Sequence, residues 1–193
     1  MKINAVLFWI ICLTLPIRSI SQVNRVYSSL DEANSVHKDS VYILNLSKQK
    51  LVDFPEKILK FTNLRQLDLS KNKLSKLPNG LSHLIHLEEL ILSKNKFILF
   101  PIPLCSTISL KHLELGRNEI SSLPTCIGQL KNLEHLDIWH NNIYSLPPTI
   151  SQLKNLKTLD FRGVNLSEKV QEQLQALLPL AKIEFDLGCD CGH

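Results

Sequence analysis

A run of apolar residues that recurs every 23 residues is the feature that most constrains the fold of this 193-residue chain. The first, fourth and sixth positions of each segment are apolar. The segments begin at Val41, Leu64, Leu87, Leu110, Leu133 and Leu156. A fixed period of this length is typical of a stacked solenoid, in which each unit buries its apolar face against its neighbours. We therefore expect an elongated protein rather than a globule with one central core.

Each segment divides into an extended half and a turning half. Apolar and polar residues alternate in the extended half, which predicts a strand with one buried face. An asparagine follows at the ninth position of four segments: Asn72, Asn95, Asn118 and Asn141. A buried asparagine there can satisfy loop backbone groups in its own repeat and in the next one. A Phe-Pro or Leu-Pro pair then ends the ladder, and apolar residues three positions apart predict a short helix or 3₁₀ turn.

The pattern LxxLxLxxNxLxxLPxxIxxLxx, present as LEHLDIWHNNIYSLPPTISQLKN at residues 133–155, resembles a leucine-rich repeat. Its second half is similar to the 23-residue subclass of Ras-suppressor-like and plant disease-resistance-like proteins. The resemblance covers residues 41–166. It implies an α/β fold: a right-handed solenoid with a parallel concave sheet, short helices or 3₁₀ turns on the convex side, and helical caps. It also implies a binding function without catalytic activity. Because cysteine-rich caps are missing, the chain is most similar to short exported members of bacterial type.

The two ends of the chain predict a targeting segment and caps rather than further domains. Residues 1–21 have the order of a secretory signal peptide, with a lysine, an apolar run and small residues before a cleavage point after Ser21. The run is short for a membrane span, although an uncleaved anchor is the alternative. Residues 22–40 form an N-terminal cap, in which Ser29 and Glu32 match a capping box and predict a helix through about Ser35. Residues 167–193 form a C-terminal cap with a helix, an extended segment at 182–185 and a Cys-rich tail.

The charge balance and the apolar leader predict a secreted protein, or one of the cell envelope or periplasm. Removing Lys2 and Arg18 with the leader lowers the 22 basic side chains to 20, against 18 acidic ones, so the formal charge falls from +4 to +2. A nearly balanced surface predicts no footprint for nucleic acid or for an anionic membrane. After cleavage we expect no membrane span and a monomer.

Four cysteines remain in the mature chain: Cys105, Cys126, Cys189 and Cys191. An oxidising compartment permits disulfides. Cys105 and Cys126 occupy different offsets in successive repeats, so no repeating bridge is built in and the core is expected not to need them. Thr107 replaces a core leucine in the third repeat, which predicts a looser turn.

The concave face is the first place to look for function, because outward strand residues lie there. The fifth positions are largely acidic, with Asp68, Glu114, Asp137 and Asp160. The eighth positions are basic: Lys48, Lys71, Lys94, Arg117 and then His140. Side by side, these columns predict either a charge-striped groove for a polar partner or a pair of self-neutralising solvated faces. Lys71, Lys94 and Arg117 are expected to form an electrostatic rim.

A denser cluster lies in the fourth and fifth repeats. His112, Glu114, His135, Asp137 and Trp139 are spaced so that all five converge on one concave patch. An exposed tryptophan is a typical binding anchor, and two imidazoles with two carboxylates suit a divalent metal. The hot-spot interpretation predicts that Trp139→Ala abolishes partner capture without changing the melting curve. An ordinary solvated surface is the alternative to both.

The C-terminal tail has its own candidate ligands, the thiols of Cys189 and Cys191 and the imidazole of His193. The spacing differs from the C-x-x-C of a zinc knuckle, so disulfide chemistry and no specific role are alternatives to metal binding.

Catalysis has no support in the sequence. There is no Gly-rich phosphate loop, no H-E-x-x-H and no serine in a Gly-rich elbow, and the chain has only six glycines. A repeat arc is an open surface with no inherent water-excluding cleft. We therefore expect no enzyme activity and no cofactor. The sequence predicts a protein-binding module that uses its concave face. A metal- or ligand-binding surface module and an intracellular scaffold for a small GTPase are the alternatives.

Overall fold

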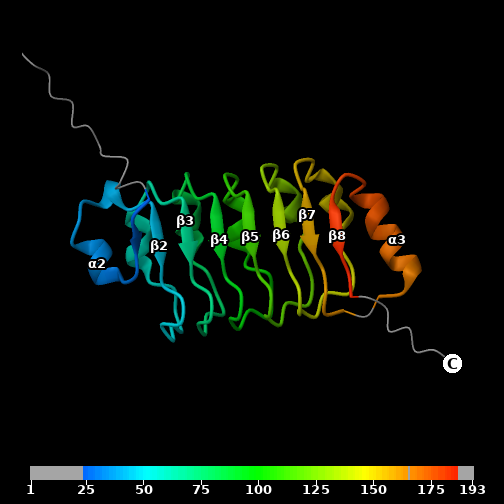
Figure 1. Ribbon diagram of the computed structural model, residues 1–193, viewed down its shortest axis with the longest axis horizontal. Helices are drawn as coiled ribbons and strands as arrows, with labels where there is room; N and C mark the ends of the chain where they lie inside the picture. Colours follow the sequence, from blue (N-terminus) through cyan, green and yellow to red (C-terminus); the bar gives the residue numbers. More distant parts are fainter. Residues whose placement is uncertain (1–23, 165, 187–193) are drawn as a thin grey trace, which may run out of the picture.

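A single parallel sheet runs the length of the molecule, with its strands in chain order from β1 to β8 (Figure 1). The computed structural model describes residues 24–186 except residue 165. The predicted leader and the predicted ligands Cys189, Cys191 and His193 lie outside the described residues. The strands are β1 Val26–Tyr27, β2 Ile43–Asn45, β3 Gln66–Asp68, β4 Glu89–Ile91, β5 His112–Glu114, β6 His135–Asp137, β7 Thr158–Asp160 and β8 Lys182–Glu184. The predicted solenoid is confirmed.

Short 3₁₀ helices return the chain on the other side of the sheet in the first five repeats, as the proline-led half of the pattern predicts. They are η2 Glu56–Lys60, η3 Asn79–His83, η4 Ile102–Ser106, η5 Thr125–Gln129 and η6 Pro148–Gln152, and η1 Lys38–Ser40 precedes them. Each of η2 to η6 starts directly after a proline. The leucines, isoleucines and phenylalanines of the pattern fill the space between sheet and turns, and most are fully buried. Burial of this kind stabilises a repeat only when its neighbours cover it.

The asparagines form a ladder that ties each repeat to the next. Asn95 is typical: its Nδ2 donates to the carbonyl oxygens of Leu69 and Leu92, each at 2.9 Å, and its Oδ1 accepts from the Leu74 amide at 3.0 Å. One side chain thus satisfies three backbone groups drawn from two repeats. Asn72, Asn118 and Asn141 repeat this arrangement.

The residue before each ladder position has a left-handed backbone. φ is 60° at Lys48, 56° at Lys71, 60° at Lys94, 55° at Arg117 and 49° at His140, and the equivalent Gly163 has φ 89°. The strands end three residues earlier, at the fifth position of the repeat. The eighth positions therefore lie in the turns that follow the strands. The prediction that they flank the acidic column on the concave sheet is wrong, because the strands are only three residues long.

Both ends are capped by helices that extend the core. α2 Leu30–Asn34 begins after Ser29, whose Oγ accepts from the Glu32 amide at 3.1 Å, while the Glu32 carboxylate accepts from the Ser28 amide at 2.9 Å. This is the reciprocal bonding that the capping-box match predicts. α3 Glu168–Leu177 follows Ser167, and β8 then pairs with β7. β1, which pairs with β2, was not predicted.

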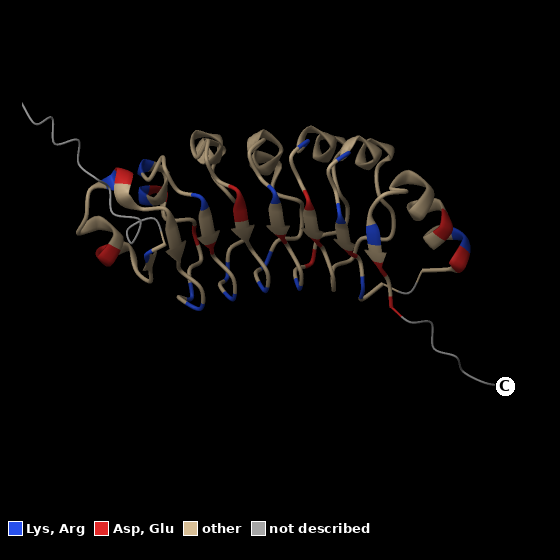
Figure 2. Cartoon of the chain, turned by 45° about the horizontal axis from the view of Figure 1, so that its top comes forward, with Lys and Arg blue, Asp and Glu red and all other residues tan. Residues whose placement is uncertain are grey.

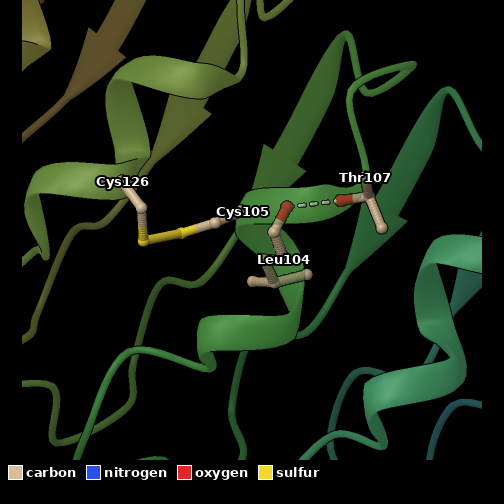
Figure 3. The surroundings of a disulfide bond; sticks show 4 residues. All are labelled: Leu104, Cys105, Thr107 and Cys126. Carbon is tan, nitrogen blue, oxygen red and sulfur yellow. Dashed lines mark hydrogen bonds between the residues drawn. A yellow bond between two sulfur atoms is a disulfide. The ribbon is translucent and has the colours of Figure 1, made fainter.

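A disulfide joins Cys105 of η4 to Cys126 of η5, with the Cα atoms 5.6 Å apart (Figure 3). It links the third and fourth repeats on the convex side, although the two cysteines have different offsets. The offset argument missed it because adjacent turns pack side by side, which brings unequal positions into contact. Thr107 lies beside this bridge, where its hydroxyl donates to the Leu104 carbonyl at 2.7 Å and the residue is fully buried. The turn expected to be looser is therefore hydrogen-bonded and covalently joined to its neighbour.

Candidate functional site

The middle of the concave face is an acidic surface with two histidines. The strand register aligns His112 with His135 and Thr158, and it aligns the carboxylates into a row. That row is Glu114, Asp137, Asp160 and Glu184. Together these side chains line a shallow hollow of about 240 Å³. The predicted convergence of His112, Glu114, His135 and Asp137 is therefore present.

The two imidazoles stack on one another. Their ring centroids are 4.5 Å apart and the ring planes differ by 19°. Nδ1 of His135 lies 2.6 Å from the hydroxyl of Thr158 on the next strand. Burial, together with the charge of His112, lowers the pKa of His135. The surroundings of the stack therefore favour the neutral form of the His135 imidazole.

The ionised forms of the carboxylates beside the histidines are destabilised by their surroundings. Burial raises the pKa of Asp137 to about 7, in spite of the Trp139 amide that donates to its Oδ1 at 3.0 Å. Burial and the nearby Glu89 likewise raise the pKa of Glu114. Glu88, which lies just before β4, differs from them in having cationic partners. Its carboxylate accepts hydrogen bonds from Lys111 and Arg65, which lower its pKa. Within residues 24–186, neither Glu114 nor Asp137 has an ion-pair partner.

Trp139 lies next to Asp137, whose Oδ1 accepts from its amide, but its side chain is only partly exposed, and its role as a binding anchor stays a prediction. Its indole lies against Gly116 in the preceding repeat, where any Cβ would overlap the ring. The guanidinium of Arg117 lies 4.5 Å from the ring centroid and the His140 ring 4.7 Å from it. Trp139 is consequently half-buried in a small cluster at the end of the strands. Gly116 is the only glycine at a seventh repeat position, a sequence signal that pointed to this pairing.

A row of basic residues lies in the loops that follow the strands, and further basic residues lie at the strand starts and in the turns on the other side (Figure 2). We define the loop edge as repeat positions eight to thirteen of the first four repeats: residues 48–53, 71–76, 94–99 and 117–122. It includes the predicted rim residues Lys71, Lys94 and Arg117, all of which are exposed. The concave patch and the basic residues therefore form two separate surfaces.

Metal binding at the concave patch has no geometric support. Among the described residues, no three His, Cys, Asp or Glu side chains are grouped in a way that could hold a metal ion. The same range has no helix both long and apolar enough to cross a membrane.

The fold defines a class: a parallel-sheet solenoid with an asparagine ladder and 3₁₀ turns on its outer face. Family models for a leucine rich repeat match residues 39–97, and for a leucine-rich repeat region match residues 101–189. The chain is a leucine-rich repeat protein. No curated protein sequence matches it.

Solved structures support this assignment. A leucine-rich repeat protein of Leptospira interrogans is 32% identical, with a TM-score of 0.66 over 76% of this chain and 43% of that one. Internalin C2 of Listeria monocytogenes is 22% identical, which shows the fold alone, with a TM-score of 0.65 over 82% and 66%. The plant peptide hormone receptor RGFR1, in complex with RGF2, is 27% identical with a TM-score of 0.54 over 65% and 20%. The chain spans between 20% and 66% of the lengths of these structures.

Proposed function

We propose that this chain is an exported, non-catalytic module that binds a protein partner through its concave face, and that the partner presents a lysine or arginine to Glu114 and Asp137. The observation that carries the proposal is the row of partly buried carboxylates with no described counterion at its centre. A cation from outside would lower the pKa values of both groups and relieve their mutual repulsion. The histidine stack beside them supplies an apolar surface for the stem of that side chain.

Two further observations support the proposal. The plant receptor of similar fold is in complex with RGF2, so a solenoid of this kind is found with a bound partner. The Cys105–Cys126 disulfide supports export over an intracellular GTPase scaffold, because disulfides persist in oxidising compartments and are rare in the cytosol. Sequencing the N-terminus of the mature protein tests export directly, and an N-terminus at residue 22 is the expected result.

Capture on the immobilised chain, followed by mass spectrometry, identifies the partner, and a variant series tests the site. We expect Glu114→Gln with Asp137→Asn to weaken partner binding by roughly 10- to 100-fold, as removal of an acceptor from a charged pair usually does. Asp53→Asn with Glu119→Gln on the loop edge is the matched control, since it removes the same charge. Equal weakening by both pairs would show that net charge, and not the concave patch, governs binding.

The raised pKa of Asp137 adds a pH signature. Its carboxyl is half ionised near pH 7 in the free protein, and a bound cation favours the ionised form. Affinity for the captured partner should therefore increase as the pH rises from 6 to 8. In Asp137→Asn this part of the dependence should disappear. A wild-type affinity that is flat over this interval contradicts a cation at Asp137.

A further inference from the structure

Basic residues are concentrated on the loop edge, although the net charge of the whole chain is small. Its four segments contain eight basic and only two acidic residues. The basic residues are Lys48, Lys50, Lys71, Lys73, Lys76, Lys94, Lys96 and Arg117, and all are exposed. None of them forms an ion pair with another described residue. Adjacent repeats are stacked about 4.8 Å apart, so the basic residues form a row along one side of the solenoid.

The scaffold does not account for these cations. The eighth position has a left-handed backbone, which glycine and asparagine adopt more readily than lysine or arginine. Four successive repeats nevertheless place a cation there, and the sixth repeat has Gly163. The tenth position tolerates Glu119 and Asn142 in later repeats. Basic residues are thus not needed for the turn, and their repetition points to a requirement outside folding.

Exposed aliphatic side chains lie on the same edge. Ile98 is 61% exposed and Leu99 is 70% exposed, and the adjoining Ile102 of η4 is 58% exposed. The other repeats act as an internal reference, because the second has Ser75, Lys76 and Asn79 at these positions and the fourth has Ser121, Ser122 and Thr125. The turn therefore forms equally well with polar residues. The apolar ones cost solvation without contributing to the core.

The aliphatic and basic groups share one groove. It has a volume of about 500 Å³ and lies between the loops of the second and third repeats. Lys76 and Lys96 line it together with Leu77, Ile98, Phe100 and Pro101. An apolar surface with ammonium groups beside it is complementary to an amphiphile in which a hydrocarbon chain adjoins an anionic group.

We propose that the loop edge docks on the surface of a bilayer that contains anionic lipids. The lysine row attracts the headgroups, and Ile98, Leu99 and Ile102 enter the boundary between headgroups and acyl chains. The loops of successive repeats lie in one row (Figure 1), so a flat surface can meet all of them at once. Val52 in the first repeat and Tyr144 in the fifth, just beyond the loop edge, occupy the position equivalent to Ile98. They are 61% and 68% exposed, and tyrosine is favoured at a lipid–water boundary. The balanced net charge predicted no membrane footprint because it does not report how charges are segregated.

Flotation of the full chain with lipid vesicles tests the electrostatic part. We expect binding to phosphatidylcholine vesicles that contain phosphatidylglycerol to exceed binding to phosphatidylcholine alone, and to fall as salt is raised. Lys73→Gln and Lys96→Gln should each weaken the phosphatidylglycerol-dependent binding about fivefold. Lys131→Gln and Lys154→Gln, on exposed sites outside the loop edge, are the matched controls and should have little effect. Equal losses in both pairs would overturn the assignment of the loop edge.

A local probe tests insertion and is insensitive to any contribution from the N-terminal segment. The indole of Leu99→Trp should shift its emission to shorter wavelength on anionic vesicles, after subtraction of the wild-type spectrum. Ile85→Trp is the control, because Ile85 is 64% exposed but precedes β4, at the opposite end of the strands. A water-like emission from position 99 on vesicle-bound protein would overturn the proposal.

The three exposed aliphatic residues Ile98, Leu99 and Ile102 can be replaced by the residues that stand at the same positions of another repeat. Ile98→Ser, Leu99→Ser and Ile102→Thr together place the fourth repeat's residues in the third, so folding should be preserved. We expect vesicle binding to fall roughly tenfold or more. Unchanged binding would show that no insertion occurs. Because the concave residues are intact in all these variants, partner capture should persist, and so the two proposals fail independently.

Discussion

The concave patch and the loop edge carry opposite charges on the same 23-residue period, yet they work under different physical conditions. Glu114 and Asp137 are partly buried and close together, so burial governs their ionisation and pH is the variable to which they respond. The loop-edge lysines are exposed and spaced along a row, so their effect is long-range and salt screens it. A solenoid can therefore support two separately tunable surfaces, because each repeat position projects from its own side of the frame.

Loss of a ladder asparagine should have the largest effect, because both surfaces depend on the stacking of the repeats. Asn95→Ala leaves two carbonyls and one amide of neighbouring repeats without their partner. At about 1 kcal/mol or more for each buried unsatisfied group, the free energy of unfolding should fall by roughly 3 kcal/mol. Chemical denaturation monitored by circular dichroism measures this. Lys96→Ala, the next residue on the loop edge, is the control and should change stability little.

The disulfide tests whether the convex side can be weakened without altering either charged surface. Cys126→Ser removes a bridge between two positions separated by 21 in the sequence, and should lower the free energy of unfolding by about 2–4 kcal/mol. The same denaturation curves in the presence of a reductant should bring the wild type close to the variant. Wild-type curves that a reductant leaves unchanged, under conditions where the thiols are shown to be free, would contradict a stabilising role.

Asp137 should make stability depend on pH in a direction opposite to that of most acids. Its folded pKa of about 7 lies above the 3.8 of an ordinary aspartate, so the folded state binds the proton more tightly. Stability from this group is full below pH 4 and is lost as the pH rises through 7. Asp137→Asn should therefore raise the melting temperature at pH 8 and leave it nearly unchanged at pH 4. At pH 8 the gain should be on the order of 1–2 kcal/mol, after allowance for solvent screening. An equal effect at both pH values would contradict the raised pKa.

The repeat period made most of the frame predictable. The strands, the asparagine ladder, the proline-led 3₁₀ turns and the capping box at Ser29 all follow from local patterns with a fixed spacing. The grouping of His112, Glu114, His135 and Asp137 also follows, because parallel strands in register stack equal positions. The pattern missed two contacts: the Cys105–Cys126 disulfide, which joins unequal positions, and the packing of Trp139 against Gly116, which share the seventh position of adjacent repeats. The first depends on how adjacent turns pack, which a column of equivalent residues does not encode. The second depends on a glycine that leaves room for the neighbouring indole, which is visible only when the residues of one column are compared for size.

Lys94 provides the smallest expected effect and the sharpest contrast between frame and surface. It precedes Asn95 in the chain, but its backbone has φ 60° and its side chain has no described partner, whereas the Asn95 side chain makes three hydrogen bonds. Because asparagine accepts a left-handed backbone more readily than lysine, Lys94→Asn should leave the free energy of unfolding within about 0.5 kcal/mol of the wild type, or raise it slightly. Denaturation measures this change, and vesicle flotation measures the loss of one cation from the loop edge. If Lys94→Asn unfolds as easily as Asn95→Ala, the loop-edge cations stabilise the fold itself. The view that the surface residues are independent of the repeat scaffold would then be wrong.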